Sequence, residues 1–195
     1  MKGLRFAKEI SVRFQLCIEN PELVISRQCF EDELATIERN GSELITAVVL
    51  LEERMIEAVS LLLFGRQSER DLERNFFSNE IMGTSEFPFA SKRRVFTALL
   101  ERTGAVSTDQ AKELRSALSK VMKWRNAFAH GRVLYQHDGQ FCLAHYSGGP
   151  QELILDDTFF ELVESTVRHC LYMCNDVIRQ ASLRASVATG ALTHG

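Results

Sequence analysis

Lys123-Trp124-Arg125-Asn126-Ala127-Phe128-Ala129-His130-Gly131 closes a strongly helical segment of the sequence. Arg125 falls in phase with an apolar face whose members recur at the helical intervals of three and four. A guanidinium in phase with a core face needs a carboxylate, a phosphate or an interface, because an unpaired buried charge is costly. The alternative is a purely structural helix end, in which basic side chains meet the negative end of the dipole and Gly131 is the cap. The apolar face consists of Ala111, Leu114, Leu118, Val121 and Phe128.

The composition predicts a soluble, globular protein with reduced cysteines. The chain has 195 residues, of which 45% are hydrophobic and 25% charged, and this length is enough for one domain with its own core. The five cysteines follow no framework spacing, so reduced thiols and a cytoplasmic location are expected. The start of the chain lacks the apolar run of a signal peptide, and the longest apolar run, Ile45–Leu51, is too short to cross a bilayer.

Charge is unevenly distributed along the chain. The net charge of −3 argues against a protein that coats nucleic acid non-specifically. Residues 91–132 nevertheless hold ten Lys/Arg and three acids, a balance of +7, whereas the rest of the chain balances at −10. A basic segment within an acidic body favours a local phosphate site. A solvated helix face opposite an acidic neighbour is an equally common explanation.

Periodicity predicts an all-α fold, an up-and-down bundle of four to six helices with a small β-hairpin inserted before the last long helix. We expect one helical domain over residues 1–184, with the hairpin insert at about 132–155, and a flexible tail over 185–195. The expected helices are Pro21–Glu38, ending near Asn40-Gly41; Ser42–Phe64, the most hydrophobic; a short one near 68–77; Ser91–Arg102; a motif helix from the capping box Ser107-x-x-Gln110 to Gly131; and a last one from Thr158 to about Ala181.

The segment after the motif predicts strands. Arg132–Gln136 and Gln140–Tyr146 are β-prone runs about His137-Asp138-Gly139, which is a hairpin signal. Ser147-Gly148-Gly149-Pro150 is expected to turn, and Glu152–Leu155 is a candidate third strand.

Glu52 stands out in the hydrophobic helix because its neighbours one turn away are Val48, Val49, Met55 and Ile56. A carboxylate among apolar side chains usually forms an ion pair, and we expect Glu52 to pair with Arg125. The alternative is that Glu52 lies at the edge of the apolar face and extends to solvent.

Arg125-Asn126-x-x-x-His130, at a helix end before Gly131, resembles the Arg-x(4–6)-His signature of the HEPN superfamily. It is most similar to the RN-x-x-AH branch, which includes mannitol-operon-repressor-like proteins. The resemblance covers roughly residues 42–131. Many HEPN proteins are small, dimeric, metal-independent endoribonucleases, often toxins or abortive-infection effectors, whereas others are non-catalytic binding or regulatory modules.

The resemblance implies an endoribonuclease in which the ribose 2′-hydroxyl attacks the adjacent phosphate. His130 is suited to move the proton, Arg125 to bind the non-bridging oxygens, and Asn126 to position the phosphate or His130. Arg125 and His130 are five residues apart, about 140° around a regular helix. A homodimer with a composite site, as the resemblance implies, would bring both groups to one phosphate. Lys123, Arg132 and Tyr135 are candidate RNA contacts, with Glu52 as the supporting residue.

Other chemistries find little support in the sequence. Walker, dinucleotide-binding, nucleophile-elbow and zinc signatures are absent, so no cofactor and no metal are expected. Cys170 and Cys174 share a helix face but have no second ligand pair, which favours buried small side chains. Two further functions stay open: a non-catalytic dimerisation or regulatory module similar to the mannitol operon repressor, and an accessory subunit. A cognate antitoxin or regulatory protein is a candidate partner.

Overall fold

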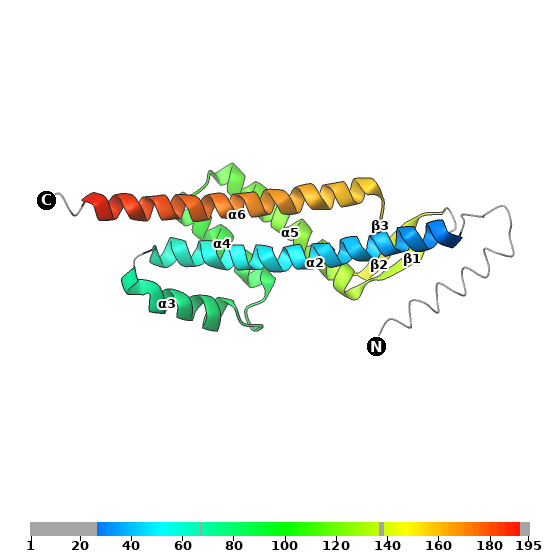
Figure 1. The fold of residues 1–195 in the computed structure, drawn as a ribbon, viewed down its shortest axis with the longest axis horizontal. Helices are drawn as coiled ribbons and strands as arrows, with labels where there is room; N and C mark the ends of the chain where they lie inside the picture. The colour runs from blue at the N-terminus through cyan, green and yellow to red at the C-terminus, as the bar shows by residue number, and fades with distance from the viewer. Residues whose placement is uncertain (1–26, 67, 137–138, 192–195) are drawn as a thin grey trace. The chain divides into compact units, whose positions relative to one another are not determined.

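The computed structural model describes residues 27–66, 68–136 and 139–191. Five α-helices make up most of this part of the chain, and a three-stranded sheet precedes the last helix (Figure 1). The predicted helix start at Pro21, the turn residues His137 and Asp138, and the last four residues of the predicted tail lie outside the described residues. The elements are α2 (Arg27–Phe64), a 3-10 turn η2 (Ser68–Arg70), α3 (Asp71–Phe76), a π-helical turn η3 (Phe77–Met82), α4 (Phe89–Thr103), α5 (Thr108–His130), β1 (Arg132–Tyr135), β2 (Phe141–Tyr146), β3 (Pro150–Ile154) and α6 (Asp157–Ala191).

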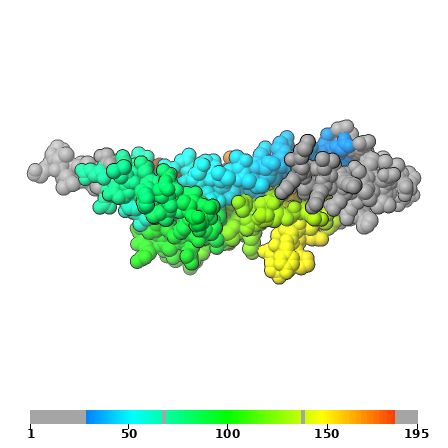
Figure 2. Space-filling model, turned by 90° about the horizontal axis from the view of Figure 1, so that it is seen from below, coloured from blue at the N-terminus to red at the C-terminus, as the bar shows by residue number. Residues whose placement is uncertain are grey.

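The mainly helical class is confirmed, but the insert is a sheet of three strands rather than a hairpin of two. β2 lies in the middle and pairs antiparallel with both neighbours, so that Ala144 is opposite Arg132 on one side and Glu152 on the other. The turn before β3 contains Gly148 and Gly149, both with positive φ, which lets the chain reverse tightly enough to add the third strand. Figure 2 shows this part of the sheet (yellow) projecting from the surface.

The chain divides after Asn40 into two compact units, and the sites described below lie in the second, Gly41–Gly195. The expectation of one domain over residues 1–184 stays a prediction. Within the described residues, no helix combines the length and the apolar composition that crossing a membrane requires.

The predicted helix break at Asn40-Gly41 is wrong, because α2 continues through both residues. The reason is tertiary packing. The ring of Phe128 lies so close to the helix that a Cβ on Gly41 would be 2.6 Å from Phe128 Cδ1. A glycine inside a helix costs about 1 kcal/mol relative to alanine, and here it makes room for an aromatic ring.

One hydrophobic core in the second unit joins α2, α4, α5 and α6. Its fully buried members include Leu51 and Met55 from α2, Phe96 from α4, Leu118 from α5 and Cys174 from α6. The predicted apolar face of α5 is therefore confirmed as the face that packs into the core: Ala111, Leu114, Leu118 and Val121 are buried, and Phe128 packs partly buried against them.

The last helix differs from its prediction at both ends. Asp156, not Thr158, is the cap, since its carboxylate accepts a hydrogen bond from the backbone N–H of Phe159 at 2.7 Å. The backbone of α6 continues to Ala191, beyond the end predicted near Ala181. The flexible tail expected over residues 185–195 stays a prediction.

Candidate functional site

The motif helix α5 begins and ends as its sequence predicts. Ser107 accepts a hydrogen bond from the backbone N–H of Gln110, and the Gln110 side chain accepts one from the backbone N–H of Ser107. This reciprocal capping box satisfies two N–H groups that a helix start otherwise leaves unpaired. The helix ends at His130, where the Gly131 N–H donates to the carbonyl oxygen of Ala127 at 2.6 Å.

Arg125 is half-buried on α5, and its guanidinium donates a hydrogen bond to Oδ1 of the neighbouring Asn126 at 3.1 Å. This contact turns the guanidinium toward the exposed side of the helix, where Asn126 lies. The two residues thus form a small polar group one turn before the helix end, with donors of both side chains left for an oxyanion.

The expected pairing of Glu52 with Arg125 is wrong. Glu52 on α2 accepts a hydrogen bond from the ammonium of Lys92 on α4, with 2.7 Å between Nζ and Oε2. The Lys92 side chain is 8% exposed and that of Glu52 is 23% exposed, so this is a largely buried ion pair. Glu52 therefore belongs to the junction of α2 and α4, and its partner could not be read from helical phase within α2 alone.

His130 is exposed at the last position of α5. Gly131 follows with an extended backbone rather than a left-handed cap, and it lies against the sheet: a Cβ there would be 2.9 Å from the carbonyl oxygen of Ala144 in β2. A side chain at position 131 would collide with this strand, so glycine lets the sheet close directly onto the helix end. His130 consequently has a fixed position where α5 meets β2.

An exposed polar stripe runs along α5 to His130, and the sequence reasoning above did not identify it. Its members are spaced four, three, four, three and four residues apart, which places them on one helix face about 27 Å long. Asn126 and His130 end the stripe, whereas Arg125 lies beside it. The stripe consists of Lys112, Ser116, Ser119, Lys123, Asn126 and His130, all exposed except the half-buried Ser119.

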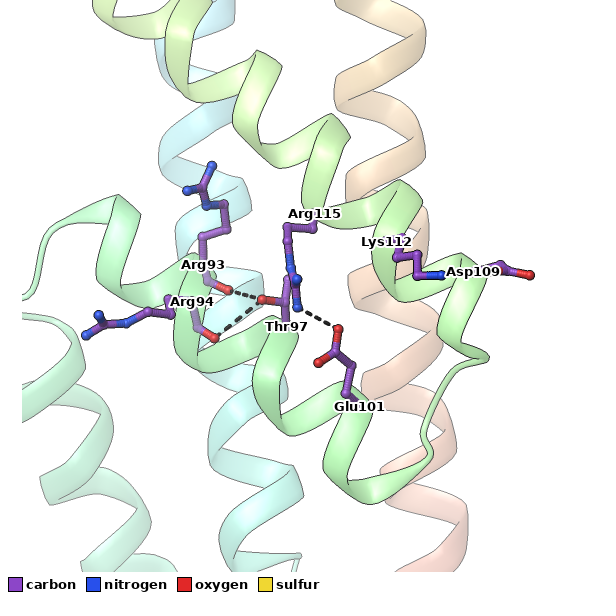
Figure 3. A network of polar contacts seen from close by, with 7 residues as sticks. All are labelled: Arg93, Arg94, Thr97, Glu101, Asp109, Lys112 and Arg115. Atoms are coloured by element: carbon purple, nitrogen blue, oxygen red, sulfur yellow. Dashed lines mark hydrogen bonds and ion pairs between the residues drawn. The ribbon is translucent and has the colours of Figure 1, made fainter.

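Helix α4 contributes a cation beside the middle of this stripe. Arg93 donates a hydrogen bond to the hydroxyl of Ser119, the third member of the stripe. Arg115 of α5 pairs with Glu101 of α4 at 2.5 Å (Figure 3). Arg94 is exposed and extends away from Arg93 and Arg115 in Figure 3. The basic segment predicted from the sequence thus gathers on the faces of two adjacent helices.

The remaining predicted contacts lie near the motif in different environments. Lys123 is exposed on the polar stripe, and Arg132 is exposed as the first residue of β1. Tyr135 is half-buried, and its ring packs edge-on against Phe141, with 4.9 Å between ring centroids. The Tyr135 ring therefore takes part in packing within the sheet.

The cysteines of α6 have the environment of core residues. Cys170 and Cys174 are buried, and burial raises the pKa of the Cys170 thiol to about 12. Burial, and then the neighbouring Cys170, raise the pKa of the Cys174 thiol as well. Across residues 27–66, 68–136 and 139–191, no group of three or more His, Cys, Asp or Glu side chains is arranged to hold a metal ion.

Comparison with protein-family models, with curated proteins and with solved structures returns no match. The HEPN resemblance therefore continues to depend on the motif residues and their context.

Proposed function

We propose that the protein is a HEPN-like, metal-independent endoribonuclease whose site lies at the C-terminal end of α5. The observation that carries this proposal is the exposed polar stripe of α5 that ends at the exposed His130. Lys123 is the lysine of the stripe nearer to His130, whereas Lys112 at the other end already pairs with Asp109 at 3.6 Å. A surface of this kind offers cations to successive phosphates and a proton-transfer group at one end of the path. A toxin or phage-defence effector is the biological role that such an activity suits.

The proposed reaction is a transesterification within RNA. The 2′-oxygen loses its proton to His130 and attacks the adjacent phosphorus, and the bond from phosphorus to the 5′-oxygen breaks. The leaving 5′-oxygen takes a proton from an imidazolium or from water, so the charges balance. Arg125 and Asn126 bind the non-bridging oxygens, where negative charge develops.

A homodimer with a composite site resolves the divergence of Arg125 and His130 around α5. The arginine of one protomer then serves the histidine of the other. Co-expression of Arg125→Ala and His130→Ala chains tests this arrangement, because a mixed dimer has one intact composite site. Partial recovery of cleavage supports it, and no recovery in isolated mixed dimers contradicts it.

Cleavage of RNA in EDTA by the wild type and by His130→Ala tests the proposed activity. We expect loss of about 10²- to 10⁴-fold in the variant, the usual contribution of a general acid or base. His169→Ala is the matched control, because His169 is a half-exposed histidine on α6, within 3.7 Å of Glu113. Equal cleavage by the wild type and His130→Ala, or none by the wild type, would remove the enzymatic claim.

A second candidate function is the non-catalytic dimerisation or regulatory module, with an antitoxin or other protein as partner. It is favoured by apolar side chains left exposed on α2, where Ile45, Val49 and Leu50 are 36%, 55% and 40% exposed. Ile45 and Val49 lie one helical turn apart, and neighbouring exposed apolar side chains are typical of interaction sites. In that case Arg125→Ala and His130→Ala leave the oligomeric state in solution unchanged, and the wild type cleaves no RNA.

A further inference from the structure

A polar groove of about 840 Å³ lies between α2 and the α3–η3 segment, away from the residues assigned to the ribonuclease site. Figure 2 shows the face on which α2 (cyan) adjoins this segment (green). Residues of α2 from Val49 to Leu61 form one wall, α3 and η3 form the other, and Lys92 of α4 contributes to the lining. The volume is that of a site for a small molecule, and a π-helical turn such as η3 is often found at functional sites.

The most buried side chains of the groove carry unused hydrogen-bonding capacity. Ser60 is 2% exposed, and its hydroxyl has no hydrogen-bond partner among the described residues. Leaving such a group unsatisfied is unfavourable. Lys92 is 6% exposed and uses one of its three N–H donors on Glu52. The groove therefore offers hydrogen-bond donors and acceptors close together, and the carboxylate of Glu52 is one of the acceptors.

The charges along the groove largely cancel, so neither a cationic nor an anionic ligand gains a net attraction. Glu52 pairs with Lys92, and Glu57 pairs with Arg54 beside the groove. Asp71 and Arg74, on the opposite wall, already neutralise each other as an ion pair. Among the remaining lining residues Glu53 and Arg66 carry one charge of each sign. These side chains therefore favour a neutral molecule that both donates and accepts hydrogen bonds, with charged and amide side chains as its partners.

The lining also disfavours a flat aromatic ligand. Among the described residues, no side chain that lines the groove is aromatic, so a nucleobase would find no ring to stack on. The apolar part of the lining is aliphatic, with Val49, Ile56 and Leu61 from α2. Asn75 and Asn79 are exposed on the other wall and present both donors and acceptors.

We infer that this groove binds a small neutral polyhydroxylated molecule of the monosaccharide class. Ser60, Lys92 and Glu52 bind hydroxyl groups in the deepest part, the two asparagines bind hydroxyl groups at the opening, and the aliphatic side chains contact the C–H groups of the sugar. The Ser60 hydroxyl, which lacks a partner in the free protein, gains one from the ligand. This site goes beyond the proposed ribonuclease activity and does not depend on it.

Isothermal titration of the full chain with D-ribose, D-xylose and D-glucose tests the inference. We expect at least one of them to bind with a Kd on the order of 0.1–1 mM, as suits a small polar ligand. Ser60→Ala is expected to weaken that binding tenfold or more while leaving the melting temperature unchanged or higher, because the variant removes an unsatisfied buried hydroxyl. Ser165→Ala, at an exposed position on α6, is the matched control and is expected to bind as the wild type does.

The combination of weaker binding and undiminished stability separates a ligand contact from a folding defect. Absence of heat with all three sugars up to about 10 mM would overturn the inference. Equal affinity of the wild type and Ser60→Ala would overturn it too. Tighter binding of a charged probe, either spermidine or inorganic phosphate, than of every sugar would show that the groove selects a charged ligand. That result would also overturn the inference.

Discussion

The ring of Phe128, inside the motif, packs against the backbone of α2 at Gly41, where a Cβ would be 2.6 Å from Phe128 Cδ1 and 2.9 Å from Cε1. This contact ties the C-terminal part of α5, two residues before His130, to a helix nearly ninety residues earlier in the chain. The position of the candidate catalytic histidine thus depends on a glycine that the sequence pattern marks as a helix end.

Gly41→Ala is expected to destabilise the protein although alanine is the better helix former. The added methyl group collides with the Phe128 ring, and overpacking of a core costs about 1–3 kcal/mol. The better helix propensity of alanine returns about 1 kcal/mol. We expect the cost of the collision to lie in the upper part of its range and therefore to exceed this gain. Urea unfolding of the wild type, Gly41→Ala and Gly41→Ala/Phe128→Leu measures this effect. The smaller side chain is expected to restore stability in the double variant, and a Gly41→Ala protein more stable than the wild type would contradict the contact.

The buried pair of Glu52 and Lys92 is expected to matter much more than the surface pair of Glu101 and Arg115. Glu52→Ala leaves the largely buried Lys92 ammonium without its partner, which costs about 3–5 kcal/mol in comparable sites. Glu101→Ala is the matched control, because the side chains of that pair are 40% and 49% exposed and exposed pairs contribute about 0–1 kcal/mol. Similar losses of unfolding free energy in the two variants would contradict the burial of the first pair.

Capping of α6 gives a sharp comparison between two nearby residues. Asp156→Ala is expected to cost about 1 kcal/mol, because the backbone N–H of Phe159 loses its acceptor. Thr158→Ala is expected to change the unfolding free energy by less than half as much, and Asp156→Asn to retain most of the stability. A larger loss of unfolding free energy in Thr158→Ala than in Asp156→Ala, measured by chemical denaturation, would show that Thr158 is the cap.

The buried thiols of α6 are expected to resist alkylation and to make stability fall at high pH. Burial raises the pKa of Cys170 from 9.0 to about 12, so the folded state keeps its proton where the unfolded state loses it. The corresponding stability is complete below about pH 9 and is lost as the pH rises toward about 12. In a Cys17→Ser background, native protein at pH 8 should react with iodoacetamide at the exposed Cys29 much faster than at Cys170 or Cys174. Equal rates at all three would contradict this burial.

Features set by neighbouring residues in the chain could be predicted from the sequence. The capping box of Ser107 and Gln110 and the buried face of α5 are of this kind, because a helix start and a helix face depend on residues three or four positions apart. The strand runs on either side of Gly139 were also recognisable from alternation and turn residues.

Features set by residues distant in the chain could not be predicted in the same way. Glu52 meets Lys92, 40 positions away, and nothing in the spacing distinguishes Lys92 from Arg125 as its partner. The packing role of Gly41 and the groove at Ser60 likewise depend on elements brought together by the fold. The spacing of the polar residues along α5 could be recognised in the sequence. That this face is exposed to solvent depends on how α5 packs against the other helices.

The most direct measurement of the central claim uses an oligonucleotide that is DNA except for one ribonucleotide, incubated with the protein in EDTA. Attack by a 2′-hydroxyl predicts a single cut, on the 3′ side of the ribonucleotide, that leaves a 2′,3′-cyclic phosphate. In His130→Ala the rate should fall by about 10²- to 10⁴-fold. Cuts at deoxyribonucleotides, an equal rate in His130→Ala, or an intact oligonucleotide after incubation with the wild type would contradict the assignment of this helix end as a ribonuclease site.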